Sequence, residues 1–317
     1  MAKVEYLLSL IKAHYNNEPE RFTTIALQIA AYESMLGHTS VANNIKDTIE
    51  KSKNLKHTSK FIENDLLGLI IENIPFGHKN DLIVPKDIHN KIERIINEFV
   101  QRDKLHNHDL ENRRKLLLWG PPGTGKTFTA SIIANELKLP LFTVLMDKMV
   151  TKFMGETSAK LRVVFDLIKR KQGVYLFDEF DAIGGERSRD NDVGEMRRVL
   201  NSFLQFIEND NSNSIILAIT NNKALLDQAL FRRFDDVIVY KLPSKSEKLA
   251  LLKNRLSKYR RVLNFNQLLP KINGLSHAEI TLACLDAIKE TILNEKIRMN
   301  NKLVMKFVKD RNEAYHN

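Results

Sequence analysis

The chain has 317 residues, of which 43% are hydrophobic and 28% are charged, and its formal net charge is +10. This composition is typical of an ordinary globular protein with about two domains and room for a small third one. No apolar run approaches the ~18 residues of a membrane span, and the N-terminal segment MAKVEYLLSLIKAHY is too polar for a secretory signal. A single cysteine, Cys284, excludes an intrachain disulfide and a cysteine-based metal cluster, so we expect a cytoplasmic protein with this thiol in its core.

Residues 1–54 are predicted to form a small N-terminal helical domain, because their apolar residues recur at helical spacing. In the first helix this apolar face comprises Val4, Leu7, Leu8, Ile11 and Tyr15. Short helices of this kind bury little surface, which favours an adaptor or docking module. Residues 55–84 have a mixed composition and are interpreted as a linker to the next domain.

Residues 120–127 read GPPGTGKT and complete the pattern G-x-x-x-x-G-K-[ST]. They follow the apolar run 115–119, a predicted strand, and they precede a predicted helix. A chance glycine loop is the alternative, and the strand–loop–helix context argues against it. Glycine lets the loop turn its N–H groups toward phosphate oxygens, Lys126 is expected to reach the β- and γ-phosphates, and Thr127 is expected to bind Mg²⁺. The residues predicted to bind nucleotide in this region are Gly120, Pro121, Pro122, Gly123, Thr124, Gly125, Lys126, Thr127 and Phe128.

Residues 174–181 read VYLFDEFD, a second predicted strand with Asp178 and Glu179 at its carboxyl end. Asp178 is predicted to hold Mg²⁺ through its water shell, and Glu179 to take a proton from the attacking water. Adjacent strand residues point to opposite faces, so one carboxylate would face the metal and the other the water. A solvated acidic turn is the alternative interpretation.

A third predicted strand, residues 214–220, ends at Asn221, whose amide is a candidate for orienting the attacking water or touching the γ-phosphate. Asparagine also ends strands for turn chemistry alone. Farther along, Arg232 and Arg233 are adjacent and are candidates for an arginine finger that reaches a neighbouring subunit. The alternative is a surface ion pair with Asp235 or Asp236.

Taken in order, these segments resemble the AAA ATPases within the wider AAA+ group. The resemblance covers about residues 81–293 and rests on GPPGTGKT, KFMGETSAKLRVVF, VYLFDEFDAIG, AITNN, LDQALFRRFD and GLSHAEI. It implies an α/β fold, with a five-stranded parallel P-loop sheet in residues 85–240 and a C-terminal helical lid in residues 241–317. It also implies ATP and Mg²⁺ as ligands and homo-oligomeric rings, usually hexamers, with ATP sites between subunits.

By position in this resemblance, Asn221 corresponds to sensor 1, and Arg232 and Arg233 correspond to the fingers. The Pro-Gly of the common RPGRFD pattern is missing, and Arg233 is the preferred finger because it still precedes Phe-Asp. GLSHAEI corresponds to the start of the lid helix near the adenine, so His277 and Ala278 are nucleotide-binding candidates. A solvated lid residue is the alternative for His277.

The stretch KFMGE falls where these proteins place a first pore loop that grips polypeptide. The substrate-binding residues implied there are Lys152, Phe153, Met154 and Gly155, whereas an isolated Phe-Met pair is ordinarily a core pair. The polar stretch GGERSRDNDVGE, residues 184–195, corresponds to a second pore loop.

The leading hypothesis is therefore an ATP-hydrolysing motor that remodels or threads protein substrates. A looser resemblance to small bacterial AAA ATPases implies a separate subtilisin-like serine protease as a partner. The alternative is a nucleic-acid loader or switch acting on DNA, because residues 241–317 carry 16 Lys and Arg against 7 Asp and Glu, a net charge of +9. A solvated helical face would explain the same charge.

Overall fold

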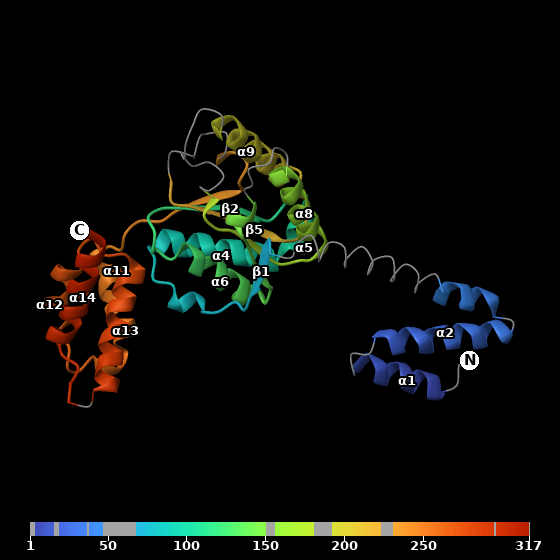
Figure 1. The fold of residues 1–317 in the computed structure, drawn as a ribbon, viewed down its shortest axis with the longest axis horizontal. Helices are drawn as coiled ribbons and strands as arrows, with labels where there is room; N and C mark the ends of the chain where they lie inside the picture. The colour runs from blue at the N-terminus through green and yellow to red at the C-terminus, as the bar shows by residue number, and fades with distance from the viewer. Residues whose placement is uncertain are drawn as a thin grey trace. The chain divides into compact units, whose positions relative to one another are not determined.

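The computed structural model describes residues 4–15, 19–36, 38–46, 68–149, 156–180, 192–222, 231–294 and 296–316. It divides into two compact units, Met1–Leu67 and Gly68–Asn317, which are treated separately (Figure 1). No helix in these described ranges is long and apolar enough to cross a membrane.

The first unit contains helix α1 (Val4–Tyr15), helix α2 (Pro19–Met35) and a further helical stretch at residues 39–46. Its small core is built on Ala13, Ile25 and Ile29. The predicted apolar face of α1 is wrong in part, because Leu8 and Ile11 are each 53% exposed. Apolar side chains occur on all sides of this helix, so their spacing alone does not decide which face packs against α2.

The second unit is built on a six-stranded sheet in the order β1-β3-β4-β5-β2-β6. The five parallel strands expected for a P-loop sheet are all present. Their bounds are β2 (Lys115–Trp119), β3 (Leu141–Val144), β4 (Val174–Phe177), β5 (Ile215–Thr220) and β6 (Asp236–Val239). A sixth strand, β1 (Ile70–Asn73), pairs antiparallel with β3 at the sheet edge.

Strand β1 corrects the predicted linker over residues 55–84, because residues from 70 onward belong to the folded unit. Asn73 donates to the Thr143 hydroxyl at 2.8 Å, and the main chain of Phe76 both donates to and accepts from the Ser131 hydroxyl at 2.8 and 2.9 Å. A 3₁₀ turn, η1 (Lys79–Asp81), follows. A four-residue strand is too short to give a clear alternating pattern, and these contacts to distant residues fix it.

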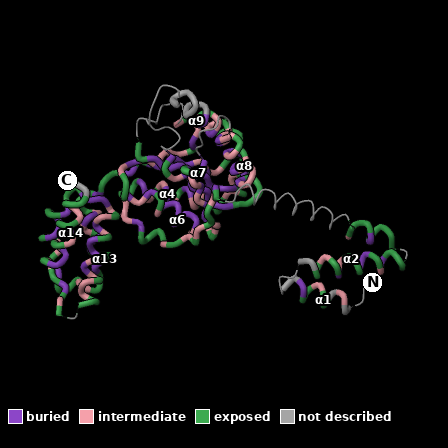
Figure 2. The backbone as a smooth tube through the Cα atoms, viewed as in Figure 1, coloured by how far each residue is buried: buried purple, intermediate pink, exposed green. Residues whose placement is uncertain are grey.

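Both faces of the sheet are covered, which explains why β4 and β5 are buried along their whole length. Figure 2 shows buried segments gathered in the interior of this part of the chain. On one face, helices α4 (Lys86–Val100) and α6 (Lys126–Leu137) pack their apolar residues against the strands. On the other face, α8 (Glu156–Arg170) and α9 (Asp192–Glu208) pack through stacked and edge-on rings that include Phe165, Phe177 and Phe203. Short helices α5 (Arg102–His106) and α7 (Met146–Met149) complete this part.

The helices after β6 form a second hydrophobic cluster of their own. They are α11 (Lys245–Arg255), α12 (Phe265–Leu268), α13 (His277–Leu293) and α14 (Asn301–His316), with 3₁₀ turns η4 (Ser257–Tyr259) and η5 (Leu269–Ile272) between them. Cys284 lies in this core, where burial raises the pKa of its thiol to about 12. The thiol is therefore packed and unreactive.

Candidate nucleotide site

The glycine-rich loop lies between the carboxyl end of β2 and the first turn of α6, as the sequence predicts. Two of its glycines are required by close packing. A Cβ on Gly120 would lie 2.3 Å from the carbonyl oxygen of Tyr240, and a Cβ on Gly123 would lie 2.5 Å from the Ser276 hydroxyl. Gly125 adopts a left-handed φ of 99°, and a Cβ there would make only an ordinary contact with Leu82 at 3.8 Å, so its constraint is conformational.

Lys126 is 5% exposed, and its ammonium group is held by three oxygen acceptors. It donates to the carbonyls of Gly120 and Pro121, both at 2.8 Å, and to the Asn221 side chain at 2.9 Å. Asn221 follows β5, which is the neighbour of β2 in the sheet. The fold therefore brings together a lysine and an amide that lie 95 residues apart in the chain.

The acidic pair lies on the turn that follows β4. Thr127 donates its hydroxyl to Asp178 Oδ2 at 2.9 Å, and the other oxygen of Asp178 accepts the N–H of Glu179 at 2.9 Å. Because β4 ends at Phe177, these carboxylates do not alternate across a strand, and the prediction that they point to opposite faces of one is wrong. Glu179 has a φ of 53°, a left-handed conformation that costs a non-glycine residue on the order of 1 kcal/mol or more.

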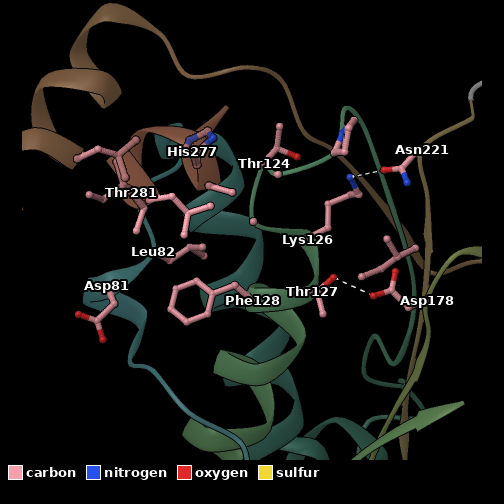
Figure 3. A pocket seen from close by; sticks show the side chains of 18 of the residues that line it. Asp81, Leu82, Thr124, Lys126, Thr127, Phe128, Asp178, Asn221, His277 and Thr281 are labelled. Carbon is pink, nitrogen blue, oxygen red and sulfur yellow. Dashed lines mark hydrogen bonds between the residues drawn. The ribbon is translucent and has the colours of Figure 1, made fainter. Parts of the chain in front are cut away.

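These groups line one cavity of ≈ 560 Å³ (Figure 3). Its other walls include residues that no motif indicated: Asp81, Leu82 and Ile83 before α4, Leu251 and Arg255 on α11, and Thr281 and Leu282 on α13. They come from segments without a characteristic pattern, and only the fold places them opposite the glycine-rich loop.

The first turn of α13 contacts the loop directly. The N–H of Ala278 donates to the carbonyl of Gly123 at 2.9 Å, and a capping box formed by Ser276 and Glu279 fixes the start of this helix. His277 lines the cavity, and neither of its buried ring nitrogens has a well-aligned hydrogen-bond partner among the described residues. Burial lowers the pKa of His277, against opposing effects of Glu247 and the Ile83 backbone.

The structure places the arginine pair near the amino ends of the parallel strands, whereas the glycine-rich loop lies at their carboxyl ends. Arg233 forms an ion pair with Glu208, the last residue of α9, and not with Asp235 or Asp236. The N–H of Asp235 donates to the carbonyl of Lys115, the first residue of β2, whereas the glycine-rich loop follows the last. Five strand residues span about 16 Å, so Arg232 and Arg233 are not brought to the cavity of their own chain.

The predicted first pore loop, Lys152, Phe153, Met154 and Gly155, lies outside the described residues, which resume at Glu156 with α8. Most of the predicted second pore loop also lies outside them, up to the start of α9 at Asp192.

The residues of the cavity suit ATP and Mg²⁺. The volume falls in the range of small-molecule sites, and the ammonium of Lys126 supplies positive charge where the loop would place phosphates. A hydroxyl and a carboxylate, Thr127 and Asp178, give the hard oxygen donors that Mg²⁺ prefers. The described residues contain no group of three His, Cys, Asp or Glu that could hold a metal.

Comparison with known proteins supports the same assignment. Residues 116–242 match the model of the family described as "ATPase family associated with various cellular activities (AAA)". The chain is 30% identical over 309 residues to an uncharacterized AAA family ATPase, y4kL, of Sinorhizobium fredii, covering 95% of this chain and 93% of that protein.

Two further relatives are longer than this chain. The chain is 31% identical to a proteasome-activating nucleotidase of Methanoregula boonei over 72% of its own length and 55% of that protein. It is 32% identical to an ATP-dependent zinc metalloprotease FtsH of Karelsulcia muelleri over 73% of its own length and 38% of that protein. It thus spans about half or less of these two. The chain belongs to the AAA family of ATPases, and it is an ATP-hydrolysing enzyme.

Proposed function

We propose that the chain assembles into a ring that remodels polypeptides with the energy of ATP hydrolysis. The observation that carries this proposal is the separation of two charged groups across one sheet. Phosphate-binding residues gather at the carboxyl edge, and Arg233 lies at the amino edge, about a strand length away. A single chain therefore has the phosphate-binding half of an arginine-assisted site at one edge and the arginine at the other. Two neighbouring copies would together form a complete site.

Within one copy, each residue of the cavity has a separate role. Lys126 would exchange its carbonyl acceptors for phosphate oxygens. Thr127 and Asp178 would hold Mg²⁺, which would neutralise charge on the phosphates. Glu179 accepts the proton of the attacking water. Asn221, already bonded to Lys126, orients the lysine and the water on the γ-phosphate side.

The finger acts between copies. Arg233 supplies positive charge to the γ-phosphate held by the adjacent subunit, and Arg232 is the second cation of the pair. Arg232 is exposed, whereas Arg233 is held by Glu208, so the two arginines differ in how their side chains are ordered. Repeated around an axis, this head-to-tail contact closes a ring. We propose a hexamer, as the resemblance implies.

The assignment of polypeptide as substrate rests on Phe153 and on the relatives. A proteasome-activating nucleotidase and a metalloprotease are, by their names, associated with proteolysis. An aromatic loop residue can pack between the side chains of any polypeptide and gain apolar contact without reading its sequence. The chain has no H-E-x-x-H motif, so proteolysis would require a separate protease, for which a serine protease is our candidate partner.

Stimulation of the ATPase by ligands tests the substrate. We expect an unfolded casein-like polypeptide to raise turnover and Phe153→Ala to remove this stimulation while basal turnover persists. Phe153→Tyr is the matched control, because it keeps the ring. A thermal melt accompanies both variants, since loss of a core phenylalanine would cost about 3–5 kcal/mol of stability. A destabilised Phe153→Ala protein would indicate that Phe153 is a core residue, and the proposed contact with polypeptide would lose its support.

A second candidate function has one observation in its favour, the net charge of +9 in residues 241–317. In this alternative the ATPase loads or switches on DNA. The same assay separates the two candidates, because a DNA loader would respond to DNA, with a steep loss at higher salt, and not to polypeptide.

A further inference from the structure

The residues that hold Arg233 and its turn in place have no role assigned to them so far. The turn that carries Arg233 is held by contacts of Arg233 itself and of Asp235, two residues later. We name the "finger mount" the set formed by Glu208, Asp235 and the main chain of Arg114 and Lys115. Phe234, between Arg233 and Asp235, is 7% exposed and anchors the turn in the protein interior.

Asp235 makes the main-chain half of this mount. One of its carboxylate oxygens, Oδ2, accepts the N–H groups of both Arg114 and Lys115 at 2.8 Å, and its own N–H donates to the Lys115 carbonyl at 2.8 Å. Three hydrogen bonds thus tie the residue two positions after Arg233 to the start of β2. The chain beyond Asp235 continues into β6, which pairs with β2.

Glu208 makes the side-chain half. Its carboxylate forms the ion pair with Arg233, and its main-chain oxygen is 3.4 Å from the ammonium of Lys115. The start of β2 is in turn fixed by the buried ion pair between Arg114 and Asp210, two residues beyond Glu208. Arg233 remains 38% exposed, so its guanidinium is held in place and still accessible to another molecule.

We propose that Asp235 and Glu208 are positioning residues for the Arg233 finger. A long arginine side chain on an unrestrained turn would sample many positions, and a shift of 1 Å at a reacting group can cost about 10²-fold in rate. Asp235 fixes the backbone of the turn and Glu208 fixes the guanidinium. This inference rests on the proposed action of Arg233 between subunits.

Mixed rings test the inference. An Asp235→Ala subunit should lose about 10²-fold in turnover as a pure ring. It should keep the affinity of the wild type for a fluorescent ATP analogue, because its own cavity is intact. Mixed with Lys126→Ala subunits, which keep the mount, it should regain turnover at interfaces that join its cavity to their finger. Mixed with Arg233→Ala subunits, it should regain none.

Matched variants separate positioning from general stability. Asp235→Asn keeps an oxygen that can accept both N–H groups and should retain most of the activity. Glu208→Gln removes only the ion pair and should behave as a milder Asp235→Ala, which keeps the proposal testable if the alanine variant does not fold. Glu111→Ala, an exposed carboxylate just before β2, should have no effect.

The outcomes for the inference and for the proposed function are distinguishable. If Arg233→Ala and Lys126→Ala subunits co-assemble and still never restore turnover, the shared site itself is wrong. If that pair restores turnover and Asp235→Ala with Lys126→Ala does not, only the positioning role is overturned. Increased turnover in Glu208→Gln would also overturn it, because Glu208 would then be competing with the phosphate.

Discussion

The carboxyl and amino ends of the parallel strands form two edges of the central sheet, and these edges differ in what their charged groups contact. At the carboxyl edge, Lys126 and Asp178 lie in a cavity and contact groups that a nucleotide and its metal can displace or bridge. At the amino ends of the strands, Arg233 and Asp235 are held by side chains and main chain of their own subunit.

This difference supports the proposal that one chain provides both halves of a shared site. The receiving edge keeps its polar groups facing open space, and it includes Glu179 in a strained left-handed conformation. Strain of this kind persists where surrounding structure imposes it, commonly at functional sites. At the donating edge, Arg233 and Asp235 are already bound within their own subunit, which suits the proposed role of holding one side chain still for another molecule.

The largest expected effect comes from the donating edge. Arg233→Ala should lower turnover by about 10³-fold, because a finger contributes charge only as the transition state forms. Its affinity for ATP should change little, whereas Lys126→Ala should lose ATP binding itself. Equilibrium binding and steady-state turnover measured on both variants check this contrast. Weak ATP binding by Arg233→Ala in the unassembled subunit would place the arginine in its own cavity and remove the distinction between the edges.

A smaller effect is expected from the receiving edge. Glu179→Gln should retain ATP and lose about 10²-fold in turnover, because only the proton acceptor is removed. Single-turnover hydrolysis with prebound ATP measures the step directly. Glu179→Gly is a useful control, since it removes the same base and relieves the left-handed strain, and its melting temperature should be higher than that of Glu179→Gln. Unchanged turnover in Glu179→Gln would eliminate its role as the base.

The smallest effect is expected from removing residues 1–67. Both edges lie in the second unit, which is compact by itself, so ATP affinity should stay within about twofold of the full chain. Any change should appear in recruitment of a partner, which a pull-down with residues 1–67 as bait would detect. A folded but nucleotide-free second unit would contradict this prediction and tie the first unit to the site.

Several features of the fold and site were predictable because each is local in the sequence. The strand, loop and helix around Lys126 are contiguous, and the phosphate-binding pattern needs no distant residue to be recognised. The apolar runs that become β4 and β5 are equally clear, since buried parallel strands are apolar throughout. Strand β1 was not predictable, because its four residues are fixed by contacts to Thr143 and Ser131 far along the chain.

The sequence by itself determined the chemistry of this protein, namely a phosphate loop, an acidic pair and an arginine pair in a fixed order. Only the tertiary structure decided where each group faces. It placed Asp178 and Glu179 on a turn after β4 and not within a strand. It also brought Asn221 to Lys126 and closed the cavity with α13. It also carried Arg233 to the far end of β2. The physical reason is that residue type sets what a group can do, whereas strand order and packing between distant segments set what it can reach.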